Sequence, residues 1–175
     1  MSMLIKQAVY EDLELIQKVG RQSYIDHFST IWTRQGIENF LNGSFSDEQL
    51  LHSLDDDNQF WFLYMQSPEK CIGVAKVNLN EYEPNIKCEG AELEKIYFLT
   101  ESVGQGYAKK FIQFILDFAE ERDQKSMYLS VLKSNVRAQR FYEYHSFVYK
   151  ADVPYSTDLY DIGMNIMKFD YCNQN

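Results

Sequence analysis

Between residues 91 and 120 a short apolar segment leads through two closely spaced glycines into a long amphipathic segment, and this order constrains the fold most. The segment Ala91–Leu99 is typical of a central strand, and Gly104 and Gly106 follow it. Apolar side chains then recur at helical spacing, at Ala108, Phe111, Ile112, Ile115, Phe118 and Ala119. Where a strand enters a helix through glycines, free backbone N–H groups meet the positive end of the helix dipole. The junction therefore predicts a seat for a phosphate-bearing molecule.

The remaining segments extend the alternation of strands and helices over the chain. Strands are expected at residues 4–8, 59–66, 71–79, 126–132, 147–152 and 161–170, and further helices at 12–28, 37–45, 46–54 and 134–145. Asn42-Gly43 is expected to end the second helix, and Ser46 with Gln49 forms a capping-box pattern at the next. The second and third strands form a hairpin, and residues 80–90 are expected as a polar connection. The order predicts an α/β fold with a mixed sheet flanked by helices.

Bulk composition narrows the class of protein. The 175 residues, 45% of them hydrophobic, suit one domain spanning residues 1–175. A net charge of −9 disfavours nucleic acid and anionic membranes as partners. The three cysteines show no CxxC spacing, which is typical of reduced thiols in a cytoplasmic protein. We expect no signal peptide and no membrane span, because the N-terminus turns acidic at once and no apolar run is long enough.

The glycine junction matches several known types of loop to different degrees. A Walker loop requires GxxxxGK followed by Ser or Thr, which is absent, and the dinucleotide motif would require a third glycine after Gly104 and Gly106. An acyl-CoA pyrophosphate loop and a plain strand–helix turn remain. A second segment, SNVRAQRFYEYHSF, places Asn135 and Tyr142 on one helix face, where they could bracket a thiol-bearing arm. Alone, this helix could equally be core packing; together the two segments favour the acyl-CoA interpretation.

At these two segments the sequence resembles the GNAT superfamily of acetyl-CoA-dependent N-acetyltransferases. The family loop, Gln or Arg-x-x-Gly-x-Gly or Ala, is matched by residues 103–108, except that Val103 replaces the usual Gln or Arg. The family helix N-x-x-A-x-x-F-Y is matched by Asn135, Ala138, Phe141 and Tyr142. The family usually continues with Gly-Phe, whereas Ser146-Phe147 stands here, so His145 or Ser146 would have to adopt a positive φ. The N-terminal half most resembles bacterial PaiA-type spermidine/spermine acetyltransferases.

The resemblance implies a set of cofactor contacts. The residues expected to bind acetyl-CoA are Ile96, Tyr97, Phe98, Val103, Gly104, Gln105, Gly106, Tyr107, Ala108, Lys109 and Asn135. Backbone amides of the loop would hold the pyrophosphate, and Asn135 would hydrogen-bond the pantetheine arm. The strand would splay from its neighbour after Ile96, with the N–H near Phe98 stabilising the tetrahedral oxyanion.

Amine chemistry suggests the catalytic groups. An aliphatic amine has a pKa of about 10.4, so a base must remove its proton before it attacks a thioester. Glu92 and Glu94 lie on one face of an ideal strand, unless a bulge intervenes. The resemblance favours Glu92 as the base and Tyr142 as the acid that protonates the departing thiolate. For either glutamate, a solvated or salt-bridged surface carboxylate is the alternative.

The acceptor site is expected near the first helix. Tyr24 and Phe28, with Glu94, are the expected substrate-binding residues. Asp26, His27 and Trp32 complete an aromatic and acidic cluster suited to an apolar-bodied cation, although the same residues could simply be an aromatic core. The three histidines are scattered, so no metal site is expected.

The expected function is a cytoplasmic N-acetyltransferase that moves acetyl from acetyl-CoA to a small-molecule primary amine, foremost a polyamine. A protein lysine or N-terminal amine is the alternative acceptor. A non-catalytic CoA sensor or interaction module is the alternative of another class. Under each of these functional hypotheses the protein could form a homodimer.

Overall fold

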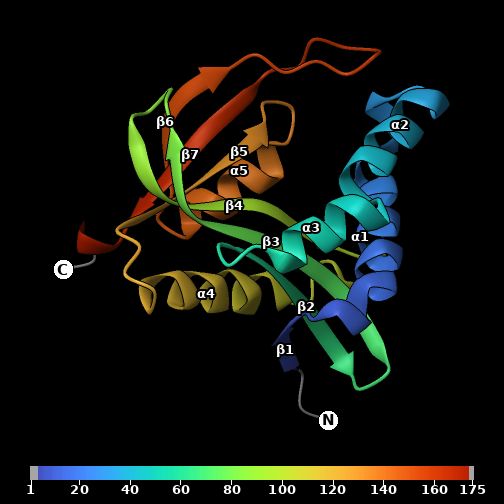
Figure 1. Ribbon diagram of the computed structural model, residues 1–175. Helices are drawn as coiled ribbons and strands as arrows, with labels where there is room; N and C mark the ends of the chain where they lie inside the picture. The colour runs from blue at the N-terminus through green and yellow to red at the C-terminus, as the bar shows by residue number, and fades with distance from the viewer. Residues whose placement is uncertain (1–3, 174–175) are drawn as a thin grey trace.

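The computed structural model describes residues 4–173 (Figure 1). Its main elements are β1 (Leu4–Gln7), α1 (Leu13–Phe28), α2 (Arg34–Phe45), α3 (Asp47–Asp55), β2 (Gln59–Ser67), β3 (Lys70–Glu83), β4 (Cys88–Phe98), α4 (Tyr107–Glu120), β5 (Ser126–Leu132), α5 (Val136–Tyr144), β6 (Val148–Val153) and β7 (Met164–Asp170). Short 3-10 turns lie at Tyr10–Asp12, Ser29–Ile31, Thr100–Ser102 and Tyr171–Asn173. Within the described range, no helix has the length and apolar character needed to cross a bilayer.

The strands form one seven-stranded sheet in the order β1-β2-β3-β4-β5-β7-β6. All neighbouring strands are antiparallel except β4 and β5, which are parallel. The mixed sheet and the β2–β3 hairpin are confirmed. Residues 80–90 are not a polar connection as expected, because β3 runs to Glu83 and β4 begins at Cys88. Cys88 is buried beside Tyr128 and Ile166, and this small apolar cluster extends the hairpin beyond its polar sequence.

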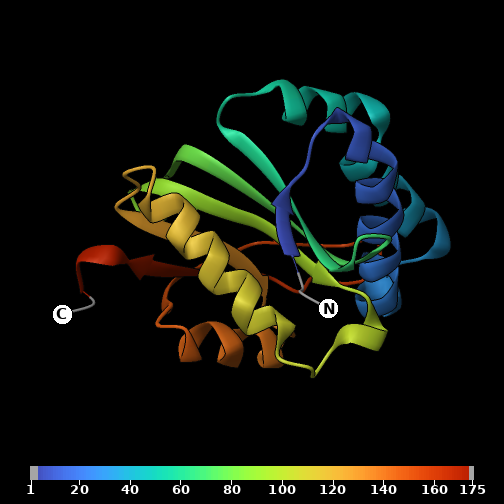
Figure 2. The same ribbon diagram turned by 90° about the horizontal axis from the view of Figure 1, so that it is seen from below.

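Helices cover both faces of the sheet (Figure 2). One core contains the apolar stripe of α4, with Phe111, Ile112 and Ile115, together with residues of α5 and the central strands. The second core joins α1, α2 and α3 to the opposite face of β2 and β3. The sheet is therefore a layer between α1–α3 and the pair α4 and α5, and β4 lies at its centre.

Helix α2 differs from the expectation that Asn42-Gly43 ends it. The helix begins after Thr33, whose hydroxyl accepts a hydrogen bond from the Gly36 N–H at 3.0 Å, and it continues to Phe45. The Phe45 ring is buried against Gly20, where an added Cβ would lie 2.3 Å from the ring. Burial of Phe45 therefore outweighs the poor helix propensity of Gly43. The N-cap expected at Ser46 is confirmed by its hydrogen bond from the Gln49 N–H at 3.3 Å.

Candidate active site

The sheet opens at its centre, between β4 and β5. Their parallel ladder consists of the pairs Ala91–Met127 and Glu92–Tyr128. Beyond them β4 continues to Phe98 beside β3, and β5 continues to Leu132 beside β7. The two strands therefore diverge directly after Glu92. The resemblance placed this divergence after Ile96, so that expectation is corrected by the observed register.

Backbone groups along the diverging part of β4 alternate in direction. The Leu99 N–H donates to the Ile72 carbonyl at 3.0 Å, so this pair is a hydrogen-bonded pair of the β3–β4 ladder. In an antiparallel ladder the next pair is not hydrogen-bonded. Phe98 and Ile96 consequently turn their N–H and C=O groups away from β3. The Phe98 carbonyl is taken by His27 of α1, so Phe98 offers only its N–H to the opening. Tyr97 departs from the expectation, because its backbone turns toward β3 and only its side chain is free to serve the site.

Both glycines of the turn between β4 and α4 adopt a left-handed backbone conformation. Gly104 and Gly106 have φ values of 82° and 80°, and Gly106 is the N-cap of α4. A Cβ added at either glycine would meet no heavy atom within 4 Å, so the space above both is clear. The first N–H groups of a helix have no partner within it, and Gly106 has no side chain to cap them. Val103 departs from the expected set, since its N–H already donates to the Thr100 carbonyl at 3.1 Å.

Side chains fix this turn from one side. The Gln105 side chain donates to the Glu101 carbonyl at 2.9 Å and accepts from the Tyr107 hydroxyl at 2.9 Å. Gln66 of β2 donates to the same hydroxyl at 3.4 Å. The side chains of Gln105 and Tyr107 thus make intramolecular hydrogen bonds, and their backbone N–H groups remain for a ligand. Ala108 is half-buried on α4, while Lys109 is exposed beside it.

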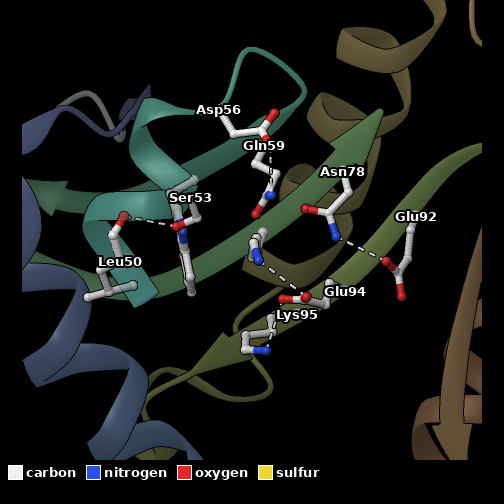
Figure 3. Close-up of polar contacts among 10 residues, drawn as sticks. Leu50, Ser53, Asp56, Gln59, Asn78, Glu92, Glu94 and Lys95 are labelled. Carbon is white, nitrogen blue, oxygen red and sulfur yellow. Dashed lines mark hydrogen bonds and ion pairs between the residues drawn. The ribbon is translucent and has the colours of Figure 1, made fainter. Parts of the chain in front are cut away.

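Glu92 lies where β4 and β5 part. It faces Asn78 of β3, whose side-chain Nδ2 donates to Glu92 Oε2 at 2.9 Å (Figure 3). Burial raises the pKa of the Glu92 carboxyl, while the hydrogen bond from Asn78 opposes the shift. A carboxylate with a raised pKa takes up a proton more readily than an ordinary one, as a general base requires.

Glu94 lies on the same face but in a different environment. The register of β3 with β4 shifts here, since Lys76 faces Lys95 and Val77 faces Leu93, so Glu94 is the extra residue of a β-bulge. Its carboxylate is 3.2 Å from Lys76 Nζ and 2.9 Å from Lys95 Nζ. Burial disfavours the charged form, but the two lysines outweigh burial and lower the pKa of Glu94. Of the two glutamates, only Glu92 lacks a cationic partner among residues 4–173.

Tyr142 and Asn135 flank the opening from α5. The Tyr142 side chain is 9% exposed and lies edge-on to Phe147. Its hydroxyl has no hydrogen-bond partner among residues 4–173, and burial raises its pKa well above the ordinary value. Asn135 is the N-cap of α5: its Oδ1 accepts from the Ala138 N–H at 3.1 Å, so its Nδ2 remains as a donor. Ser146 adopts φ 68°, as the absence of the family's glycine led us to expect.

The predicted aromatic and acidic cluster divides into two parts. Tyr24 packs on Phe28 at 4.8 Å and on Tyr97 at 5.8 Å between ring centroids, and its hydroxyl accepts from Trp32 Nε1 at 3.0 Å. These rings join α1 to β4.

Asp26 and His27 face elsewhere. The Asp26 carboxylate accepts from the Thr100 N–H at 3.3 Å, and His27 Nε2 lies 2.8 Å from the Phe98 carbonyl oxygen. They hold the end of β4, and the His27 ring also lies edge-on to Phe28, with 6.3 Å between ring centroids.

Sequence reasoning missed Tyr155, which follows β6. Its side chain interacts electrostatically with the Tyr24 hydroxyl, and its own backbone carbonyl accepts from the N–H groups of Ile162 and Gly163, each at 2.9 Å. The loop between β6 and β7 reaches α2, as Figure 1 shows. There the Asp158 carboxylate accepts from the Thr33 N–H at 3.0 Å and from its hydroxyl. No local pattern signals this residue, because the contact joins segments more than a hundred residues apart.

A mixed sheet that opens beside the glycine-bearing start of a helix defines the fold of acyl-CoA-dependent N-acyltransferases. The chain belongs to the acetyltransferase (GNAT) family, whose model matches residues 22–147. An uncharacterized N-acetyltransferase from Archaeoglobus fulgidus is 26% identical over 141 residues, which cover 80% of this chain and 89% of that protein.

Solved structures share the whole fold. The PaiA N-acetyltransferase from Thermoplasma acidophilum, in complex with coenzyme A, is similar with a TM-score of 0.80 and 21% identity, covering 98% of this chain and 100% of that one. The spermidine/spermine N-acetyltransferase SpeG from Vibrio cholerae has a TM-score of 0.70 and 18% identity, covering 99% and 96%. At these identities the likeness establishes the fold.

Proposed function

We propose that this protein transfers the acetyl group of acetyl-CoA to a primary amine of a small molecule, foremost a polyamine, by direct attack of the amine on the thioester. The observation that carries the proposal is the divergence of β4 and β5 directly after Glu92. It leaves backbone N–H groups, a carboxylate without a cationic partner and a tyrosine hydroxyl without a hydrogen-bond partner among residues 4–173 around one opening.

The residues fit a CoA thioester. The clear space above Gly104 and Gly106 suits a pyrophosphate that approaches the backbone closely, and the dipole of α4 favours its charge. Ile96 would bind the amide-bearing arm through its outward backbone groups. Asn135 Nδ2 would donate to the same arm from α5. When bound, acetyl-CoA supplies the activated acyl carbon.

Each remaining group would hold or move a proton or a charge. Glu92 takes the proton from the ammonium, directly or through water. The Phe98 N–H donates to the oxygen that becomes negative during attack. Tyr142 is protonated at neutral pH, as any tyrosine is, and it would give its proton to the departing sulfur as the thiolate forms. The amide forms, the thioester bond breaks, and CoA leaves as the thiol.

A cationic acceptor is favoured by charge and by aromatic surface. The net charge is −9, and Glu92, Glu94 and Glu81 interact electrostatically at β3 and β4. The half-buried rings of Phe28 and Tyr97 could contact the methylene body of such an acceptor, while Tyr24, only 5% exposed, packs behind them. The name of the Vibrio cholerae relative, a spermidine/spermine acetyltransferase, agrees with a polyamine.

Acetyl-CoA-dependent release of free thiol, measured over polyamines, amino acids, aminoglycosides and peptides, tests the proposal. We expect the highest kcat/KM for a polyamine, falling as ionic strength rises, because charge attraction is screened over about 8–10 Å at physiological salt. The fall should be steeper for spermine than for a monoamine of equal length. A flat salt response, or faster turnover of a peptide amine, would overturn the polyamine assignment and leave the reaction class standing. No thiol release with any amine would overturn the reaction itself.

A further inference from the structure

Polar side chains form a row across three neighbouring strands beside the opening. Gln59 of β2 faces Asn78 of β3, and Asn78 faces Glu92 of β4. The backbone of the adjacent pair Asn58–Leu79 is hydrogen-bonded at 2.8 Å, so Gln59 and Asn78 form a non-hydrogen-bonded pair, whose side chains lie closer. Asn78 is thus an amide held between a second amide and the carboxylate proposed as the base.

The two ends of the Asn78 amide are not used equally. Its Nδ2 donates to Glu92 Oε2 at 2.9 Å, but Oδ1 has no hydrogen-bond partner. Among residues 4–173 it is the only fully buried side-chain N or O atom in this condition. Asn78 is only 5% exposed, so water gives little compensation, and an unsatisfied buried carbonyl is costly. Figure 3 shows Oδ1 turned toward Gln59, away from Glu92.

This asymmetry fits one protonation state of Glu92. An ionised carboxylate only accepts hydrogen bonds, so the amide must present Nδ2 to it. A protonated carboxyl group carries an O–H donor, which an amide oxygen can accept. A half-turn of the Asn78 amide would exchange its ends, presenting Oδ1 to Glu92 and Nδ2 to Gln59. The partnerless oxygen would then gain a donor when Glu92 gains its proton.

We propose that Asn78 is a positioning residue for the base, and that its amide rotates by half a turn when Glu92 takes the proton of the amine. The inference rests on the proposed role of Glu92. In the resting enzyme Asn78 holds one carboxylate oxygen and leaves the other for the ammonium. After the other oxygen takes up the proton, the carboxyl group turns about its own axis and brings the new O–H to the rotated amide, which accepts from it. Both protonation states are then hydrogen-bonded in a buried site.

Other charged and titratable groups act on Glu92 from each strand around it. Glu94 on β4 and Glu81 on β3 disfavour its ionised form, and Lys76 on β3 favours it. Tyr128 on β5 lies directly beside Glu92, and burial, followed by the nearby Glu92 carboxylate, raises the pKa of its hydroxyl. None of these four groups hydrogen-bonds Glu92 in the described part of the chain, which leaves Asn78 as its one such partner.

Nuclear magnetic resonance titration tests the rotation directly in the resting enzyme. The side-chain NH₂ signals of Asn78 are assigned by their loss in Asn78→Leu, and the carboxyl-carbon signal of Glu92 by its loss in Glu92→Gln. The chemical shifts of both should change with pH around the same midpoint, which is the pKa of the Glu92 carboxyl group. In Glu92→Gln the Asn78 signals should no longer move in that pH range. Asn78 signals that stay constant while Glu92 titrates would overturn the rotation.

Substitution tests the positioning role. Asn78→Leu removes the donor at nearly constant volume, and the Glu92 pKa should rise by about one to two units, the loss expected for a hydrogen bond to a charged group. The acid limb of the pH profile of kcat/KM should move to higher pH by the same amount, and activity should recover at high pH. Asn39→Leu, the same change at an exposed position of α2, should shift neither.

The outcomes separate this inference from the proposed function. An unchanged Glu92 pKa in Asn78→Leu, or in Asn78→Ser should the leucine variant not fold, would overturn the positioning role while Glu92 could remain the base. If Glu92→Gln keeps the acid limb of the wild-type profile, the base assignment itself fails, and the catalytic part of the inference fails with it.

Discussion

Replacing Gly106 by alanine isolates what the glycine turn contributes. Gly106 adopts φ 80° and ψ 4°, a left-handed conformation that an L-residue enters at a cost of roughly 1–2 kcal/mol. An added methyl group meets nothing within 4 Å, so no steric clash adds to this cost. Alanine also restricts the unfolded chain, which returns about 0.4–1 kcal/mol. The net loss is therefore about 1 kcal/mol, or about 2–4 °C in Tm for a chain of this size.

The loss of acetyl-CoA affinity should exceed the loss of stability. If residue 106 relaxes toward negative φ, the N–H groups of the turn no longer converge, and each lost hydrogen bond to a charged group is worth about 1.5–3 kcal/mol. At a ligand concentration of 100 times Kd, binding adds about 2.7 kcal/mol, which corresponds to about 5–10 °C in Tm. We expect the variant to lose at least half of that shift at the same concentration.

Thermal unfolding with and without ligand measures both quantities. Gly43→Ala is the matched control: the same change, at a helical glycine with nothing within 4 Å, but far from the turn. It should raise Tm by a few degrees, since alanine is favoured over glycine in helices by about 1 kcal/mol, and it should keep the full acetyl-CoA shift. S-acetylpantetheine lacks the pyrophosphate, so its affinity should differ little between Gly106→Ala and wild type.

One result would refute the reasoning. A folded Gly106→Ala protein with the full acetyl-CoA shift would mean that the turn does not hold the pyrophosphate. Equal losses for acetyl-CoA and S-acetylpantetheine would instead place the damage at the opening of the sheet.

Three further substitutions probe the remaining groups. Tyr142→Phe should lower kcat by roughly 10²-fold with an unchanged acetyl-CoA shift in Tm, and unchanged turnover would make Tyr142 a packing residue. Glu92→Gln should raise Tm at neutral pH, because it replaces a carboxylate that folding disfavours in its ionised form. The pKa of Glu92 is raised in the folded state, so its contribution to stability is present below the ordinary pKa of 4.5 and is lost as pH rises through the folded-state pKa. The difference from wild type, followed by unfolding at several pH values, should shrink toward acid pH; a difference that grows there would contradict the raised pKa. Gly36→Ala would place a Cβ 2.2 Å from Asp158 Oδ2, so it should displace the β6–β7 loop, which carries Tyr155. We expect a higher KM for the amine and an unchanged KM for acetyl-CoA; equal changes in both would show that this loop and Tyr155 do not contribute to the acceptor site.

Local patterns predicted most elements because each depends on nearby residues. The stripe of α4 follows directly from the helical side-chain period, and the strand β5 from a short apolar run. Helix α2 was predicted, but its expected end at Asn42-Gly43 was wrong, because Phe45 packs on Gly20 and this tertiary contact carries the helix past Gly43. The extension of the β3–β4 hairpin likewise depends on Cys88 meeting Tyr128 and Ile166.

The site was predictable where motif and backbone coincide. The positive φ of Gly104 and Gly106 follows from residue type, and the positive φ of Ser146 from the missing family glycine. The Glu94 bulge, the engaged N–H of Val103 and the approach of Tyr155 to Tyr24 depend on register and long-range contacts. A single sequence carries no local signal for these features.

The divergence of β4 from β5 gives the sheet an edge in its interior. The unpaired N–H and C=O groups of a strand at the outer edge of a sheet can pair with a strand of another chain, and proteins prevent this with charged residues and proline. Here the edge of β4 at Ile96 and Phe98 is bordered by β5 on the other side, so only a slender chain could lie against it. Under the proposed function, the donor arm would add to this edge as a peptide adds to a sheet, through amides of its own. Thioesters without amide groups, however reactive their acyl carbon, should therefore be poor donors.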